Sequence, residues 1–475
     1  MRKLPEINRR IFCNRTLNLR SIKAVGFDMD YTLIHYNTEA WEQRAYEHVR
    51  NRLAEAGFPV KHLRFDASLV KLGLTIDTEL GNLVKANRFR YIKRACHGTR
   101  PLSYDEQRKT YGRVQIDLNQ PRWRFMNTLF SLSEACMYVQ MVDLLDKGRL
   151  DNRLGYSDVY RIVRSRIDET HMEGTLKQEI INDPKRFVEL DKEIPLALLD
   201  LKYAGKKLLL ITNSEWHYSE AMMNYAFAPF LPKKMNWKEL FDVIIVEAQK
   251  PDFFTTRKSI FEIVDHKEGL LRPFFGKLKK GGTYLGGNAA LLEDWLGIDG
   301  EEFLYIGDHI YADVLVSKDL LRWRTALIVR ELEQDIESDK KFLSKQKELE
   351  KLMVQKECLE HEYSLLRLDL QRLKNKYGPK PKATMGSLQQ SIKTVRAKVV
   401  SLDERIGPLA KQASELTNSI WGPLMRAGND KSYIARQIER YADIYMSRVS
   451  NLVEQTPFVY MRSQRGMQPH DPGNL

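Results

Sequence analysis

IKAVGFDMDYTLI, residues 22–34, is the stretch of this chain that decides its fold. Its aliphatic run ends in two aspartates, Asp28 and Asp30, which polar residues follow. Such a run predicts a buried strand whose carboxyl end carries side chains into a cleft. Two carboxylates separated by one residue at a strand end can reach the same small site. Asp28 could then stay ionised beside a divalent cation and attack phosphorus, while Asp30 protonates the leaving oxygen.

Three later stretches repeat this plan: KKLLLITNS (206–214), FDVIIVEAQKP (241–251) and EFLYIGDHIYADV (302–314). Each is an aliphatic strand with polar residues at its carboxyl end, and helical sequence separates one from the next. This alternation predicts an α/β fold with a Rossmann-like parallel sheet. In such sheets ligands bind beyond the carboxyl ends of the strands, so we expect the four polar clusters to meet there.

The residues at these strand ends suit phosphate chemistry, although each has an ordinary structural alternative. Thr212, Asn213 and Ser214 offer donors to phosphate oxygens, or could cap a helix. Lys250 could neutralise phosphate charge, or be a surface lysine. Asp308 and Asp313 offer oxygen ligands to a hard cation, for which Mg²⁺ is the expected ion.

The length of the connections predicts how the chain is divided. About 170 residues separate the first two strands, far more than a strand–helix crossover requires. We therefore assign residues 1–40 and 200–330 to the catalytic α/β core. Residues 41–199 are expected to form an inserted, mainly helical cap that supplies substrate specificity.

The last third of the chain has a different pattern. Apolar residues recur at heptad spacing on both sides of YGPKPKATMG (377–386), which predicts an antiparallel coiled-coil hairpin over 331–425. Its tip, residues 372–398, holds eight basic residues and no acidic one. The tip is either a solvated surface or a docking site for an acidic partner. Residues 426–475 are expected to pack on the core or on a neighbouring subunit.

The amino-acid composition excludes several classes of protein. The chain has 475 residues, 43% of them hydrophobic, which supports packed cores and excludes general disorder. Its four cysteines are far apart, which argues against a zinc module or a disulfide framework and fits a reducing compartment. No membrane span or secretory signal is apparent, so we expect a cytoplasmic protein with no membrane partner. The net charge of +13 favours anionic ligands, although nucleic acid is not the expected partner.

Taken together, DMDYT (28–32), ITNS (211–214), Lys250 and GDHIYAD (307–313) resemble, in order, the four motifs of the haloacid dehalogenase superfamily. More narrowly, the chain resembles the cytosolic purine 5′-nucleotidases that prefer IMP and GMP. The resemblance implies Mg²⁺-dependent hydrolysis of purine nucleoside 5′-monophosphates through an aspartyl-phosphate, with phosphate transfer to nucleosides. It also implies a homo-oligomer, either a tetramer or a dimer.

The resemblance further implies a role for each matching residue. Asp28 would be the nucleophile and Asp30 the general acid and base. Mg²⁺ would be held by Asp28, the Asp30 carbonyl, Asp308 and Asp313. Phosphate would be held by Thr212, Asn213, Ser214, Lys250 and Lys177. The purine base would be held by Arg164, Asp168, His171 and Phe130. Family members are activated by ATP-type effectors at a separate site, which the resemblance places near Asn127 and Tyr311.

Two other functions stay open at this point. The chain could be a phosphatase of the same superfamily that acts on a different phosphomonoester. Alternatively, it could be an interaction protein that uses the basic coiled-coil hairpin.

Overall fold

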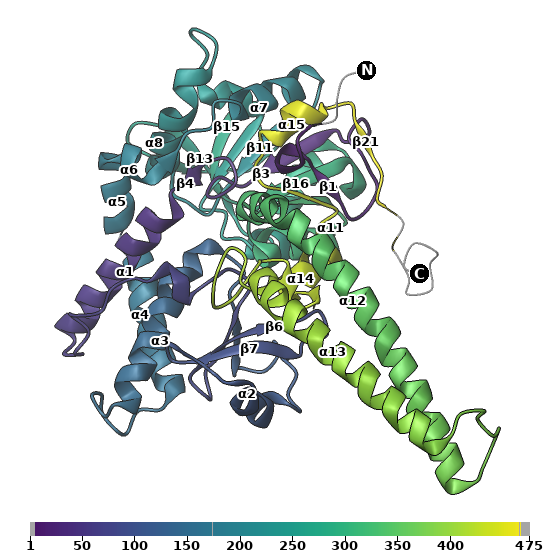
Figure 1. The fold of residues 1–475 in the computed structure, drawn as a ribbon. Coiled ribbons are helices and arrows are strands. Elements are labelled where there is room, and N and C mark those ends of the chain that lie inside the picture. Colours follow the sequence, from purple (N-terminus) through teal and green to yellow (C-terminus); the bar gives the residue numbers. More distant parts are fainter. Residues whose placement is uncertain (1–4, 173, 465, 467–475) are drawn as a thin grey trace. The chain divides into compact units, whose positions relative to one another are not determined.

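A computed structural model describes residues 5–172, 174–464 and 466 of the chain. The chain divides into two compact units, residues 1–333 with 424–475 and residues 334–423. The larger unit contains the α/β sheet, and the smaller one is a pair of long helices (Figure 1).

Among the described residues of the larger unit, ten strands form one sheet, of which seven neighbouring strands run parallel (Figure 1). Across the sheet the order is β1 (Phe12–Cys13), β20 (Ile444–Met446), β17 (Arg324–Ile328), β16 (Phe303–Gly307), β3 (Ala24–Phe27), β11 (Lys207–Ile211), β12 (Val243–Val246), β15 (Gly282–Gly286), β13 (Ile260–Asp265) and β14 (Leu270–Pro273). The parallel α/β sheet expected from the sequence is confirmed. Strand order reverses at β3, because β11 and β16 pair with its two opposite edges. A crevice at such a reversal is where open α/β sheets bind ligands.

The central strands β3, β12 and β16 are buried on both faces, as their continuous aliphatic sequences require, whereas the edge strand β14 is exposed. In β11, Leu208 and Leu210 belong to one apolar cluster, whereas Leu209 and Ile211 belong to another. Helix α7 (Ile194–Tyr203) precedes β11, and the helices that follow core strands include α8 (Trp216–Phe227), α9 (Asp252–Thr255), α10 (Ala289–Leu296) and α11 (Val316–Leu321). Burial on both faces fixes the strands, so the loops at their carboxyl ends are held in place.

The region between β3 and β11 is helical but also contains a second sheet. Besides α7, its helices are α1 (Thr38–Glu55), α2 (Tyr104–Tyr111), α3 (Leu132–Asp146), α4 (Tyr156–Met172), α5 (Thr175–Asn182) and α6 (Pro184–Phe187). An antiparallel sheet has the order β8 (Arg100–Pro101), β7 (Ile92–His97), β6 (Asn82–Ala86), β5 (Thr75–Asp77) and β9 (Trp123–Phe125). This second sheet was not expected from the sequence, since its strands of two to six residues show too little periodicity.

The end of the chain adds a strand to the main sheet. After α14 (Tyr433–Tyr441), β20 pairs in parallel with β17, and α15 (Asn451–Gln455) follows. Asp443, just before β20, receives ion pairs from Arg15, Lys318 and Arg324. Residues 426–464 are therefore part of the larger unit's own core.

The smaller unit is a helical hairpin formed by α12 (Leu332–Asn375), which begins at the unit boundary, and α13 (Met385–Ser414). Figure 1 shows the two helices side by side along their length. Lys356 Nζ lies 2.6 Å from Asp403 Oδ1, and Lys345 Nζ donates to Gln412 Oε1 at 2.8 Å. These two lysines interrupt the heptad seam in the sequence, and each finds a polar partner on the facing helix. Such polar pairs within a seam specify its register.

No helix in the described part of the chain combines the length and the apolar character that a membrane crossing requires.

Candidate active site

Four strand ends bring the sequence-predicted residues to one edge of the main sheet. Asp28 follows β3, Thr212 follows β11, and Asp308 follows β16. Lys250 lies four residues beyond the end of β12. Because these strands are parallel neighbours, all four residues emerge at the same edge.

A buried lysine joins two of the aspartates. Lys250 Nζ lies 2.7 Å from Asp28 Oδ1 and 2.7 Å from Asp313 Oδ1, and it donates to the Tyr305 hydroxyl at 3.1 Å. Its side chain is only 2% exposed. Burial alone would lower the pKa of Lys250, but the two carboxylates hold it well above its usual range. The lysine therefore carries a fixed positive charge beside Asp28.

Three carboxylates form a cluster around this charge. Oxygens of Asp28, Asp308 and Asp313 all lie within 4.8 Å of one another. Burial, together with the neighbouring acids, raises the pKa of Asp28 to about 7 and the pKa of Asp308 well above its usual range. Burial is the larger cause of both shifts, and the close approach of the three acids adds to it. A hard divalent cation such as Mg²⁺, which prefers oxygen ligands, fits this donor set.

The loop after β16 is folded tightly around Asp313. The backbone N–H of His309 donates to Asp313 Oδ2 at 3.1 Å, within a π-helical turn over Ile310–Leu315. A Cβ atom added to Gly307 would lie 2.4 Å from Asp313 Oδ2. Only glycine therefore fits at the end of this strand.

Hydroxyl groups orient the second aspartate of the DMDYT motif. The Ser214 hydroxyl donates to Asp30 Oδ2 at 2.6 Å, and the Tyr36 hydroxyl donates to Asp30 Oδ1. Tyr218 in turn donates to the Tyr36 hydroxyl at 2.9 Å. Burial raises the pKa of Tyr36 well above its usual range, so this hydroxyl keeps its proton and acts as a donor. Both carboxylate oxygens of Asp30 are thus held in one orientation.

The residues expected to hold phosphate are near this site, but several have partners within the protein. The Thr212 hydroxyl accepts from the Ser214 backbone N–H at 3.1 Å. The Asn213 side chain accepts from the Lys250 backbone N–H at 2.6 Å and donates to the Lys250 carbonyl at 3.1 Å. Lys177 Nζ donates to Glu215 Oε2 at 2.6 Å and to the Ser214 hydroxyl at 3.3 Å. Asn213 thereby fixes the loop that carries Lys250.

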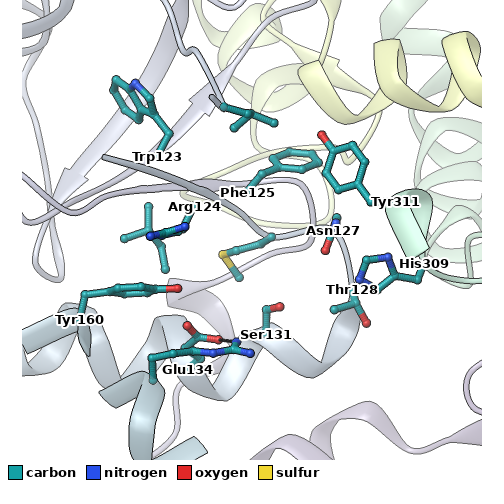
Figure 2. Close-up of a pocket in the computed structure, with 14 residues that line it drawn as sticks. Trp123, Arg124, Phe125, Asn127, Thr128, Ser131, Glu134, Tyr160, His309 and Tyr311 are labelled. Carbon is teal, nitrogen blue, oxygen red and sulfur yellow. Dashed lines mark hydrogen bonds and ion pairs between the residues drawn. The ribbon is translucent and has the colours of Figure 1, made fainter. Parts of the chain in front are cut away.

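A cavity of about 400 Å³ opens between α3, α4, β9 and the loop after β16 (Figure 2). Arg164 lines it and is held by two acids, since its guanidinium donates to Glu134 Oε2 at 2.8 Å and pairs with Asp168 Oδ1 at 2.9 Å. Tyr160, Arg124 and His309 also point toward this space in Figure 2. His309 directly follows Asp308, so the cavity adjoins the carboxylate cluster.

The other residues assigned from the resemblance are distributed around this cavity. Asn127 and Tyr311, expected at a separate effector site, line the same cavity as Arg164. Asp168 is half exposed on α4. The Phe130 ring lies edge-on to Tyr31, with ring centres 4.8 Å apart. Neither Asp168 nor Phe130 is among the described lining residues. The side chain of His171, on α4, lies outside what the structure describes.

Comparison with known proteins assigns the chain to a family. The model described as the 5′ nucleotidase family matches residues 11–473, nearly the whole chain. The chain belongs to the 5′ nucleotidase family. Members of this family are hydrolases of the 5′-nucleotidase type, and the resemblance to the cytosolic purine 5′-nucleotidases agrees with this membership.

Relatives in the family are similar over most of their length. The chain is 27% identical to 5′-nucleotidase domain-containing protein 2 of Homo sapiens over 460 residues, which cover 93% of this chain and 81% of that protein. It is 26% identical to a 5′-nucleotidase domain-containing protein of Dictyostelium discoideum, covering 97% of this chain and 74% of the other. A solved archaeal beta-phosphoglucomutase from Pyrococcus is 12% identical, with a TM-score of 0.31, over 65% of this chain and 87% of that one.

Several residues at the site of this 5′ nucleotidase family member were not predicted from the sequence. Tyr36 and Tyr218 align Asp30, Glu134 holds Arg164, and Tyr160 lines the cavity. Tyr36 lies in the two-residue strand β4 (His35–Tyr36), and the other three lie on helices α8, α3 and α4. A tyrosine or glutamate on an amphipathic helix carries no local signal that separates a site residue from a packing residue.

Proposed function

We propose that this chain hydrolyses purine nucleoside 5′-monophosphates such as IMP and GMP, and also transfers the phosphate to nucleosides. The observation that carries the proposal is the meeting of Asp28, Lys250, Asp308 and Asp313 at one sheet edge, in a member of the 5′ nucleotidase family. This arrangement supplies a carboxylate nucleophile, a fixed positive charge and a cation site within a few ångströms. These are the components that phosphoryl transfer requires.

The chemistry takes two in-line steps on this chain's own residues. An oxygen of Asp28 forms a bond to phosphorus while the bond from phosphorus to the nucleoside O5′ breaks, and Asp30 gives its proton to that oxygen. In the second step Asp30 takes the proton of a water, whose oxygen then displaces phosphate from Asp28. A nucleoside 5′-hydroxyl in place of water completes a transfer instead of a hydrolysis. Lys250 balances the phosphate charge throughout.

The residues that would hold Mg²⁺ are Asp28, the Asp30 carbonyl, Asp308 and Asp313. The ion would supply charge neutralisation for the phosphate oxygens in the transition state. Thr212, Ser214 and Lys177 are proposed to receive the phosphate, and Lys177 would exchange its contact with Glu215 for one with the substrate. Arg164 is proposed to donate to the 6-oxo group of the base. Asn127 and Tyr311 stay proposed contacts for an ATP-type effector, which would then occupy part of the cavity that Arg164 lines.

Removing divalent cations is expected to abolish hydrolysis of IMP. The carboxylate cluster would then face the phosphate with only Lys250 to offset its charge, so repulsion would raise the barrier. The measurement is phosphate release after EDTA treatment and dialysis, with Mg²⁺ added back. Full activity in EDTA, with no further increase when Mg²⁺ is added, would contradict the proposed cation site.

Replacing Arg164 by alanine is expected to raise the KM for IMP about 10- to 100-fold, because a charged hydrogen bond to the base is lost. Hydrolysis of p-nitrophenyl phosphate, which has no purine, should change little. Arg161→Ala is the matched control, since Arg161 lies on the same helix and its side chain is 78% exposed. Equal losses on both substrates would instead favour a phosphatase for another phosphomonoester.

A panel of IMP, GMP and other monophosphates tests the substrate preference. Adding inosine as an acceptor tests phosphate transfer, and assays with and without ATP test activation by an effector.

A further inference from the structure

The imidazole of His309 is held in one tautomer by the backbone of its own loop. The backbone N–H of Ala312 donates to His309 Nδ1 at 2.9 Å, so that His309 caps the π-helical turn over Ile310–Leu315. A ring nitrogen that accepts a hydrogen bond carries no proton, and the ring proton is therefore on Nε2. Within the described part of the chain, no protein group accepts a hydrogen bond from Nε2. His309 thus offers one oriented N–H donor that the fold itself does not use.

This donor belongs to the wall of the cavity that Arg164 lines. His309 is one of the lining residues, and Figure 2 shows it beside Thr128, at the end away from Glu134 and Tyr160. Glu134 accepts a hydrogen bond from the Arg164 guanidinium, so the proposed base contact lies with Glu134. His309 and Arg164 therefore line different ends of the same space.

The place of His309 in the sequence brings it next to the reacting groups. It directly follows Asp308, one of whose carboxylate oxygens lies within 4.8 Å of an oxygen of Asp28. Consecutive Cα atoms are about 3.8 Å apart, so the imidazole starts one residue from the carboxylate cluster. A nucleotide with its phosphorus at Asp28 and its base at Arg164 has its ribose between these two groups. The ribose then lies on the side of the cavity that His309 lines.

We propose that His309 binds the ribose of the substrate, with its Nε2–H donating to one sugar hydroxyl. This inference rests on the proposed function, because it takes a nucleoside monophosphate as the substrate. An analogue without the bound hydroxyl leaves the donor unpaired, and a site built to bind a hydroxyl discriminates against such an analogue. His309 thereby adds selectivity for nucleotides over phosphomonoesters that have no ribose.

Substrate analogues test the contact in the wild-type chain. The value of kcat/KM is measured for IMP, 2′-deoxy-IMP and 3′-deoxy-IMP with saturating Mg²⁺. At least one analogue should be hydrolysed about fivefold less efficiently than IMP, and that analogue identifies the bound hydroxyl. Equal values for the three substrates overturn the inference and leave the proposed function in place. Hydrolysis of none of the three overturns the proposed function, and the inference with it.

His309→Asn removes the donor and preserves the cap of the loop. The asparagine Oδ1 takes the place of Nδ1 and can accept from the Ala312 N–H, as asparagine commonly does at an N-cap, whereas no atom replaces Nε2. The preference for IMP over the discriminating analogue should fall to within about twofold, because the two deletions remove the same hydrogen bond. Hydrolysis of p-nitrophenyl phosphate, which has no ribose, should fall much less than hydrolysis of IMP.

His62→Asn is the matched control for this variant. His62 is an exposed histidine that is not among the lining residues of the cavity, so its replacement should keep the wild-type preference. A preference for IMP that persists in His309→Asn overturns the inference. An equal loss on IMP and p-nitrophenyl phosphate also overturns it, because His309 would then act on the loop or on the phosphate instead of the ribose.

Discussion

Replacing Asp28 by asparagine is expected to lower kcat for IMP by at least about 10³-fold, since an amide cannot attack phosphorus in place of a carboxylate. The substitution keeps the size of the side chain. It also leaves Lys250 paired with Asp313, so the fold should survive. The measurements are phosphate release with saturating substrate and Mg²⁺, and thermal unfolding of the same preparation.

Asp252→Asn is the matched control for this experiment. Asp252 also pairs with a lysine, Lys258, at 2.8 Å, but its side chain is 54% exposed. Its replacement should leave kcat within about twofold of the wild type, because exposed ion pairs contribute little. If Asp28→Asn kept a substantial fraction of activity while the control behaved normally, Asp28 would not be the nucleophile.

Replacing Lys250 by methionine is expected to destabilise the larger unit by about 3–5 kcal/mol, the usual effect of removing one partner of a buried ion pair. Asp28 and Asp313 would remain buried without the ammonium that lies between them. Activity should also fall at least about 10²-fold, because the fixed charge beside the phosphate is lost. Urea or thermal unfolding measures the first effect, and phosphate release under native conditions measures the second.

Lys258→Met distinguishes burial from the simple loss of a lysine. Lys258 is eight residues away and forms an ion pair of almost the same length, but its side chain is 35% exposed. Its removal should cost at most about 1 kcal/mol and leave kcat unchanged. Similar losses in the two variants would show that the position of Lys250 has no special role.

The strand ends could be predicted because each signal is contiguous. In residues 22–34 the aliphatic run and the two aspartates are adjacent, so one short stretch reports both the strand and its polar end. The heptad pattern of the hairpin is likewise local and extends over many turns. Lys345 and Lys356 interrupt that pattern, and they are tolerated because each meets a polar group on α13.

The missed features depend on residues that are distant in the sequence. Tyr36 and Tyr218 are 182 positions apart, yet their hydroxyls lie 2.9 Å from each other and align Asp30. Strand β20 has three residues, too few for a period, and it forms because β17 offers it an open edge. Arg164 reaches Glu134 only because α3 and α4 pack together.

The sequence alone determines an α/β protein with carboxylates and a lysine at the ends of parallel strands. It does so because hydrophobic periodicity and sequence motifs depend only on residues that are close together in the chain. Only the tertiary structure determines which charged side chains of the site lie next to one another. Lys250 stands between Asp28 and Asp313, and Asp308 completes the cluster, because three loops converge where strand order reverses at β3. Electrostatic energy depends on separation and burial in space, and no local pattern of residues encodes either quantity.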